Sequence, residues 1–81
     1  MHIHILNFGI VKDIFGTREI QFPLPNTPLT VGALRQQLMA QQPALQQLIS
    51  LAIAVNGAYA HDETPLRAGD EVVLIPPVSG G

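Results

Sequence analysis

Four consecutive apolar residues near the end of the chain, Val72 to Ile75, constrain the fold more than any other feature of the sequence. A strand with apolar residues on both faces is covered on both sides, so Glu71 to Ile75 is predicted to lie in the middle of a sheet. A chain of 81 residues has room for one domain with a small core. The rest of the sheet must therefore come from the few elements that precede this strand.

Two strands are predicted near the start of the chain. Residues 2–8 (HIHILNF) are rich in β-branched and aromatic side chains, which favours a strand. The segment 18–24 alternates, which places three apolar residues on one face: Ile20, Phe22 and Leu24. Gly16 and Thr17 are typical turn residues. The two strands are therefore predicted to form a hairpin with a longer loop.

The middle of the chain carries the helical signals. Thr30 is a good N-cap, and the apolar spacing that follows predicts the main helix over 31–41. Pro43 suits the first position of a short second helix. Both segments carry a neutral polar face of Gln36, Gln37, Gln41, Gln42, Gln46 and Gln47. These glutamines are either a solvated helix face or a recognition surface.

A third strand is predicted over 53–55, with a brief return over 58–60. Asn56-Gly57 between them is the dipeptide that tight hairpin turns prefer. The turn at 68–70 then leads into the last strand. The resulting order predicts an α+β fold, a mixed sheet with one main helix on one face and a short second helix, its first and last strands side by side in the middle.

The strands carry more apolar residues than one helix can cover. Leu6 and Phe8 lie in the opposite phase to Ile3 and Ile5, and the last strand has two apolar phases as well. Two hypotheses follow. Phe8 and Ile75 belong to a protein-binding patch, or a bulge returns them to the core.

Composition excludes several classes of protein. Charged residues make up 12% of the chain, the net charge is −2, and the four basic residues are scattered, so no surface for a nucleic-acid backbone is expected. No window approaches the roughly 20 apolar residues of a membrane span, and the first residues lack the features of a signal peptide. A cytoplasmic protein is expected. The chain has no cysteine, so any sulfur chemistry must use another atom.

Two polar clusters have alternative interpretations. His2 and His4 share one face of a strand and could hold a metal, but two ligands are too few for a convincing site. We expect no metal. The run His61-Asp62-Glu63 is either an acid–base cluster or a solvated loop next to Thr64-Pro65.

Four segments together resemble a known family: NFGIVKDIFG, TVGALRQQL, AIAVNGAYA and DETPLRAGDEVVLIPPVSGG. They look like the small, sulfur-carrying subunit of molybdopterin synthase, the MoaD family. The resemblance implies the ubiquitin-like β-grasp fold, with a domain over 1–75 and an extended tail over 76–81. Similar sequences often carry an aromatic residue, Phe-Ala and an Arg where this chain has Asn7, Phe8, Gly9 and Lys12. Lys12 lacks the planar fork with which arginine makes bidentate contacts.

The resemblance also implies a mechanism. A separate activating enzyme uses ATP to adenylate the carboxylate of Gly81, a sulfur donor protein converts it to a thiocarboxylate, and the sulfur is donated to cyclic pyranopterin monophosphate. The product is the molybdopterin dithiolene. No cofactor is expected on this chain, and the resemblance implies that it is the small subunit of a sulfurtransferase. The catalytic side chains are expected on a large subunit, in an assembly of two small and two large subunits.

Site residues follow from the same resemblance. The tail enters the active site of the large subunit through Pro76, Pro77, Val78, Ser79 and Gly80. Glycine has no Cβ to obstruct a narrow channel, and prolines keep a spacer extended. The expected interface residues are Phe8, Lys12 and Ile75. Two other functions stay open: a sulfur carrier for thiamin synthesis, and a noncatalytic ubiquitin-like module or protein tag.

Overall fold

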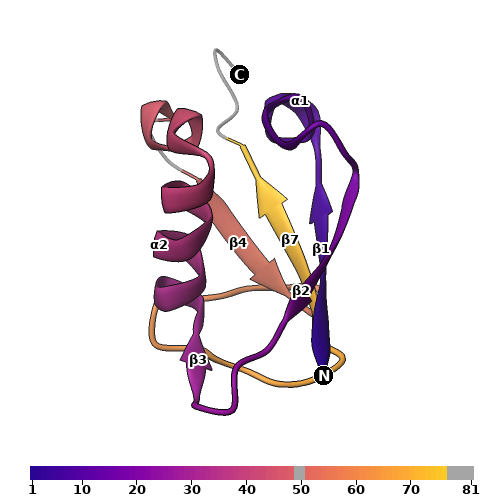
Figure 1. Ribbon diagram of the computed structural model, residues 1–81, viewed down its shortest axis with the longest axis vertical. Coiled ribbons are helices and arrows are strands. Elements are labelled where there is room, and N and C mark those ends of the chain that lie inside the picture. The colour runs from indigo at the N-terminus through magenta and orange to yellow at the C-terminus, as the bar shows by residue number, and fades with distance from the viewer. Residues whose placement is uncertain (49–50, 77–81) are drawn as a thin grey trace.

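The computed structural model describes residues 1–48 and 51–76, and its centre is a five-stranded mixed sheet (Figure 1). The strand order is β2-β1-β7-β4-β5. The strands are β1 (His2–Asn7), β2 (Glu19–Pro23), β4 (Ala52–Val55), β5 (Ala58–Tyr59) and β7 (Glu71–Ile75). The first and last strands are parallel neighbours, and every other pair in this sheet is antiparallel. The predicted sheet, with these two strands in its middle, is confirmed.

Helix α2 (Val31–Gln41) covers one face of the sheet (Figure 1). Its predicted N-cap is present, since the Thr30 hydroxyl accepts a hydrogen bond of 3.2 Å from the backbone N–H of Ala33. The short second helix after Pro43 is a 3-10 helix, η1 (Pro43–Gln47). Among the described residues, no helix is both long and apolar enough to cross a membrane.

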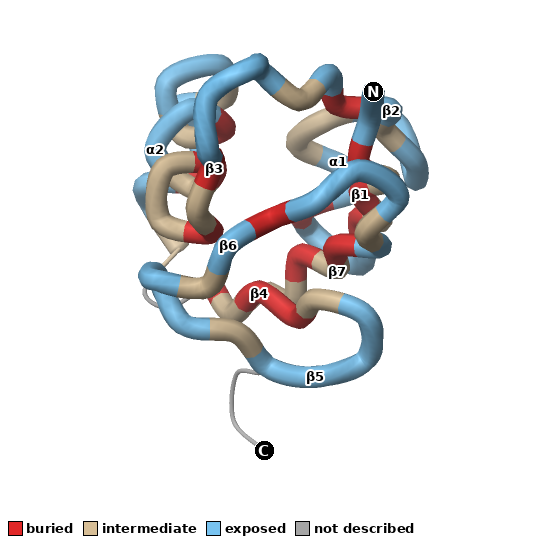
Figure 2. The backbone as a smooth tube through the Cα atoms, turned by 90° about the horizontal axis from the view of Figure 1, so that it is seen from below, coloured by how far each residue is buried: buried red, intermediate tan, exposed pale blue. Residues whose placement is uncertain are grey.

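The core lies between α2 and the sheet. Ile3, Ile5, Val72 and Leu74 point to this side and are fully buried. From the helix, Leu34 and Leu38 pack against the same cluster. Figure 2 shows these buried stretches along β1, β7 and β4 and on part of α2. Of the two sets of alternate apolar residues on the central strands, the set that faces α2 therefore forms the core.

A second, two-stranded sheet closes the lower end of the molecule. It pairs β3 (Leu29–Thr30) with β6 (Pro65–Leu66), which crosses that end in Figure 2. Both strands are two residues long and join segments that are far apart in the sequence, so the local pattern did not predict them. The Asn56-Gly57 turn is as expected, with φ values of 51° and 88°.

The connection between β1 and β2 differs from the prediction. It is not a simple hairpin loop, because helix α1 (Gly9–Phe15) lies within it. The usual signals are absent: Phe8 is the N-cap residue but makes no side-chain cap, and the first turn has no acidic residue. The helix is held by burial of Val11, and it ends at Gly16, whose φ of 76° is left-handed. The first strand consequently stops at Asn7, one residue earlier than predicted.

Candidate functional site

The site begins where β7 ends, beside the start of α1 (Figure 1). The parallel register pairs Asn7 with Leu74, which brings Phe8 next to Ile75. A Cβ built on Gly9 would lie 3.4 Å from Cγ of Pro76, so the backbone at Gly9 packs directly against the last described residue. The root of the tail is therefore framed by residues 8–9. The remaining tail residues named from the sequence lie outside the described residues: Pro77, Val78, Ser79, Gly80 and Gly81.

The sheet face opposite α2 carries a row of apolar side chains. The pairing register places four residues directly side by side across four strands: Leu6, Val73, Ala54 and Tyr59. A second pair, Ala52 and Ile75, lies one step nearer the tail. We call these six residues the outer apolar face. Leu6, Val73, Ile75 and Ala52 are partly exposed, and Tyr59 is 75% exposed, so this face is largely open in the isolated chain.

Phe8 extends the outer apolar face toward α1. Its backbone is still extended (φ −127°, ψ 156°), so the strand alternation continues and its side chain follows that of Leu6. The side chain is 49% exposed, and the β1 register is uninterrupted. The hypothesis of a bulge that returns Phe8 to the core is therefore wrong.

The other sequence-predicted interface residue, Lys12, lies exposed on α1. Two exposed large apolar residues, Ile10 and Tyr59, were not predicted from the sequence. Ile10 is 51% exposed on α1, a helix that was not predicted. Tyr59 could have been found by continuing the register across the Asn56-Gly57 turn, because this register pairs it with Ala54.

Asn7, which departs from the pattern of similar sequences, is fully buried beneath α1's connection to β2. Its backbone N–H donates to the Arg18 carbonyl at 2.8 Å, and its side-chain Nδ2 donates to the Thr17 carbonyl at 3.0 Å. These two bonds fix the chain that returns from α1 to the edge of the sheet.

The two polar clusters named from the sequence are separate from this site. His4 Nε2 lies 3.4 Å from a carboxylate oxygen of Glu19. No group of three or more potential metal ligands occurs among residues 1–48 and 51–76. His61, Asp62 and Glu63 are all exposed, as expected of a solvated loop.

Asp62 has a structural role in that loop. Its carboxylate lies 3.5 Å from Nε of Arg35, and its backbone carbonyl accepts a 2.9 Å hydrogen bond from Gly32. A Cβ on Gly32 would come within 2.9 Å of Cβ of Asp62, so the close approach requires glycine. Arg35 also donates to the Leu51 carbonyl. The loop is thereby tied to the start of α2.

Asp70 fixes the turn before β7. Its two carboxylate oxygens accept from Nδ2 of Asn56 at 2.9 Å and from the backbone N–H of Arg67 at 2.8 Å. The Asn56 side-chain oxygen in turn accepts from the N–H of Glu71. The direction of β7, and hence the place where the tail begins, is set by these bonds.

Sequence similarity to known proteins extends over nearly the whole chain. The model of the ThiS family matches residues 5–81. A molybdopterin synthase sulfur carrier subunit from Chlamydomonas reinhardtii is 36% identical, with 100% of both chains covered. The protein of the same name from Escherichia coli is 37% identical, with 98% of this chain and 99% of that protein covered.

Solved structures have the same fold. SAMP1 from Haloferax volcanii is 27% identical, with a TM-score of 0.81 and 100% of both chains covered. A chain in the protein–protein complex of subunits 1 and 2 of molybdopterin-converting factor from Helicobacter pylori is similar at 28% identity and a TM-score of 0.69, again with full coverage of both chains. The ubiquitin-like β-grasp fold expected from the sequence is confirmed, and the chain belongs to the ThiS family.

Proposed function

We propose that this chain is the sulfur carrier subunit of molybdopterin synthase. The observation that carries the proposal is similarity over the full length to sulfur carrier subunits of that enzyme, at 36 and 37% identity. The geometry supports it, because the chain leaves the sheet at the end of β7, next to an open apolar face and six residues before Gly81.

The chemistry must take place at the carboxylate of Gly81. A carboxylate is a poor electrophile, so it first attacks ATP on a separate activating enzyme and forms an acyl adenylate with release of pyrophosphate. The outer sulfur of a persulfide on the donor protein then attacks the acyl carbon, forming the C–S bond while the C–O bond to AMP breaks. A thiol reductant cleaves the remaining S–S bond to the donor and frees the chain. The product is a thiocarboxylate that carries one sulfur in place of one oxygen. A chain with no cysteine can carry sulfur in this way, since no side-chain thiol takes part.

The acceptor in this proposal is cyclic pyranopterin monophosphate, held by a large subunit. A dithiolene contains two sulfurs, so two loaded chains are consumed for each product. In keeping with this, two small and two large subunits form the proposed assembly. The Helicobacter pylori complex supports a partner of this kind. ATP belongs to the activating enzyme, this chain binds no cofactor, and the proposed location is the cytoplasm.

The outer apolar face is the proposed contact with the large subunit. It includes residues of β7, the strand from which the tail leaves, and is continuous with Phe8, while Lys12 is exposed on α1. Burying partly exposed apolar surface of this kind favours association. Contact here would place Pro76 and Pro77 at the entrance of the partner's active site as a stiff spacer. Val78 would then make an apolar contact, Ser79 a hydrogen bond, and the two glycines would occupy the narrow part.

The test is the intact mass of the chain after incubation with a candidate activating enzyme, ATP and a sulfur donor. The expected result is a gain equal to replacement of one oxygen by sulfur. A chain lacking Gly81 and a chain with one alanine added after Gly81 are the matched controls, and neither should gain mass. Loading of the extended chain would refute chemistry at this carboxylate.

A second candidate function has a specific observation in its favour. The similarity to SAMP1, a small archaeal modifier protein, suggests a protein tag joined to lysine side chains through an isopeptide bond. Mass spectra of tryptic digests from cells discriminate the two. Abundant lysine-linked conjugates without sulfur loading would favour the tag.

A further inference from the structure

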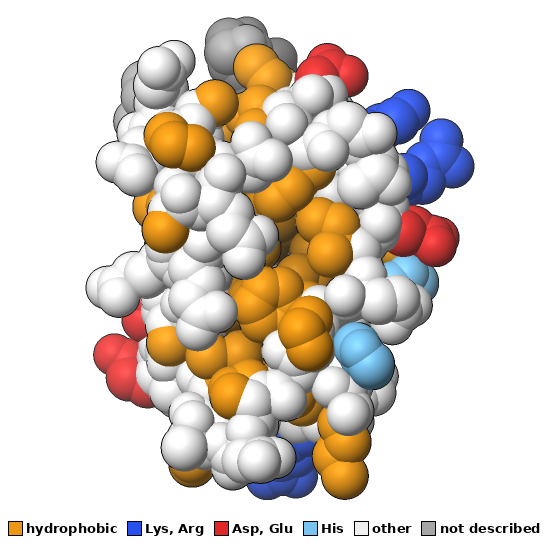
Figure 3. All heavy atoms as spheres, viewed as in Figure 1, with side chains coloured by type: hydrophobic (Ala, Val, Ile, Leu, Met, Phe, Trp, Pro, Cys, Tyr) orange, Lys and Arg blue, Asp and Glu red, His pale blue; other side chains and the backbone are white. Residues whose placement is uncertain are grey.

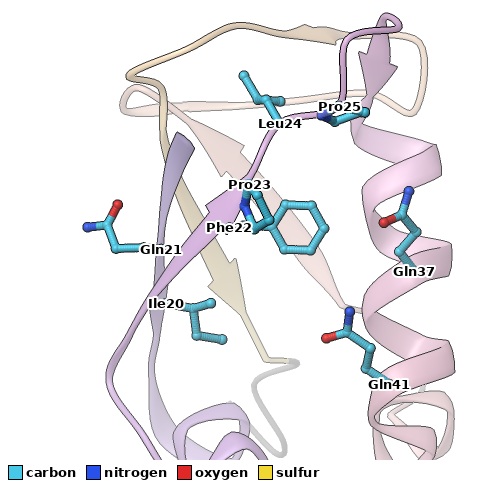
Figure 4. A pocket seen from close by; sticks show the side chains of 8 residues that line it. All are labelled: Ile20, Gln21, Phe22, Pro23, Leu24, Pro25, Gln37 and Gln41. Carbon is cyan, nitrogen blue, oxygen red and sulfur yellow. The ribbon is translucent and has the colours of Figure 1, made fainter. Parts of the chain in front are cut away.

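A groove runs between β2 and α2, on the side of the sheet away from the outer apolar face. It has a volume of about 500 Å³, within the range of about 300–1,000 Å³ in which proteins hold small ligands. Figure 3 shows the apolar side chains that gather along it, and Figure 4 shows its lining. The lining residues are Ile20, Gln21, Phe22, Pro23, Leu24, Pro25, Gln37 and Gln41.

The groove exists because α2 does not fully cover the apolar face of β2. Ile20, Phe22 and Leu24 share that face, but Phe22 alone is buried, and its ring points toward α2 in Figure 4. On the opposite wall, α2 presents the amide side chains of Gln37 and Gln41. Two of the six glutamines noted in the sequence thus line this largely apolar groove.

The backbone of β2 offers hydrogen bonds at the edge of the groove. Arg18 accepts from Asn7, and Leu24 donates to Met1, so the even-numbered residues 18–24 direct their backbone groups toward β1. By alternation, the N–H and C=O of Gln21 point outward from the sheet. β2 is an edge strand, with no strand of the described part of the chain on its other side.

The outward positions on either side of Gln21 are restricted. At Glu19, both backbone groups already bond to the Thr17 hydroxyl, at 3.4 and 3.2 Å. Proline at position 23 has no N–H to donate, although its carbonyl can accept. The edge therefore presents a complete donor–acceptor pair at Gln21 alone, which favours a short added strand over a long one.

The absence of charged side chains in the groove, among the residues that the structure describes, restricts what can bind there. A charged group entering such a furrow would lose hydration without gaining an opposite charge, whereas uncharged apolar groups would gain by burial. A strand added at Gln21 would direct every second side chain over Ile20, Phe22 and Leu24.

We propose that this groove binds a short, extended, uncharged segment of a partner protein, with apolar residues at alternate positions, as an added strand centred on Gln21. The main chain of the bound segment forms hydrogen bonds with the backbone of Gln21, and its apolar side chains fill the groove between β2 and α2. This binding site uses neither the tail nor the outer apolar face. It is therefore independent of the proposed sulfur transfer and is compatible with simultaneous contact at the other face.

The test is an NMR titration of the full chain, labelled with nitrogen-15, with a capped peptide Gly-Val-Thr-Val-Thr-Val-Gly. We expect saturable shifts at Ile20, Gln21, Phe22 and Gln37, and slower hydrogen exchange of the Gln21 amide. The matched control peptide, Gly-Val-Val-Thr-Thr-Val-Gly, has the same composition without the alternation and should bind at least about tenfold more weakly. Equal binding of the two peptides would overturn the proposal.

Two pairs of variants locate the contact. Gln21→Pro removes the outward N–H, whereas Gln21→Thr retains it, so the first should weaken binding about tenfold and the second little. Gln37→Glu adds a charge to the groove wall and should weaken binding, whereas Gln36→Glu, at an exposed position outside the lining, should not. The second pair keeps the test valid if the proline variant does not fold.

Three outcomes contradict the proposal. The first is the absence of shifts at millimolar peptide, and the second is shifts confined to the outer apolar face. The third is a concentration-dependent shift of the Gln21 amide without peptide, which would assign the groove to a second copy of this chain.

Discussion

The two faces of the sheet use the same strands in different ways. On the face beneath α2, Ile3, Ile5, Val72 and Leu74 are fully buried, whereas on the other face their neighbours Leu6 and Val73 are partly exposed. The chemical type of the residues hardly differs between the faces. What differs is the presence of a helix to cover them.

The comparison shows how a small domain can keep an apolar surface available without losing a defined fold. Alternate residues of each strand face opposite sides of the sheet. One set forms the core beneath α2, and the other set lies together on the opposite face. Because Pro76, the first residue of the tail, follows directly from β7, the outward set and the root of the tail lie side by side. The residues that stabilise the fold are therefore distinct from those proposed to bind a partner, and substitutions of adjacent residues test this distinction.

The largest expected effect is on the buried face. Leu74→Ala should lower the free energy of unfolding by about 2–5 kcal/mol, because it leaves a cavity beneath α2. The total for a chain of this length is about 4–12 kcal/mol, so this variant is close to unfolding. Val73→Ala, one residue earlier on the other face, should cost about 1 kcal/mol or less. Urea unfolding followed by circular dichroism measures both, and equal losses would contradict the division between the faces.

Introducing a charge on the outer apolar face or at Phe8 should change stability less but weaken binding strongly. Phe8→Asp and Ile75→Asp should weaken binding to the large subunit at least about 100-fold, because a carboxylate would be desolvated at an apolar contact. Circular dichroism and size exclusion should show a folded chain.

The control for these variants is His2→Asp, an exposed position of the same phase on β1 beyond the apolar row. It should bind the large subunit normally in isothermal titration calorimetry. Normal binding by both the Phe8 and the Ile75 variants would show that the proposed surface is wrong.

The smallest effect is expected at the helix that covers the core. Thr30→Ala removes the N-cap bond to Ala33 and should cost about 1 kcal/mol of stability. Thr27→Ala, at an exposed position before β3, is the matched control and should change stability little. Both variants should bind the large subunit with unchanged affinity in the same calorimetric experiment, since the cap lies on the buried side. A loss of affinity for the first would couple the two faces.

The parts of the fold that follow local rules were predictable. The bounds of α2 and β7 agree with the prediction. Helix α2 is marked by its N-cap and its apolar spacing, and β7 is marked by four consecutive apolar residues. The turn at Asn56 and Gly57 has the expected backbone angles.

Other parts depend on tertiary contacts. Helix α1 begins with glycine and β-branched residues and has no side-chain cap, so burial of Val11, rather than local propensity, holds it. The β3–β6 pair rests on two residues from each segment.

The site was predictable in part for the same reason. Strand phase alone identified Phe8 and Ile75 as surplus to the core. Ile10 and Tyr59 were missed because their positions depend on α1 and on the register beyond a turn. The groove beside Phe22 could not be predicted, since alternation assigns Ile20, Phe22 and Leu24 to one face without showing how far α2 extends over them.

The most direct test of the account is transfer from the loaded chain. The chain bearing a Gly81 thiocarboxylate would be mixed with a large subunit of molybdopterin synthase and cyclic pyranopterin monophosphate, and the pterin products measured by mass spectrometry. The account predicts a dithiolene product, with two loaded chains converted to the carboxylate form for each product. Sulfur that stays on the chain with this acceptor, but is transferred to the acceptor of thiamin synthesis, would contradict it.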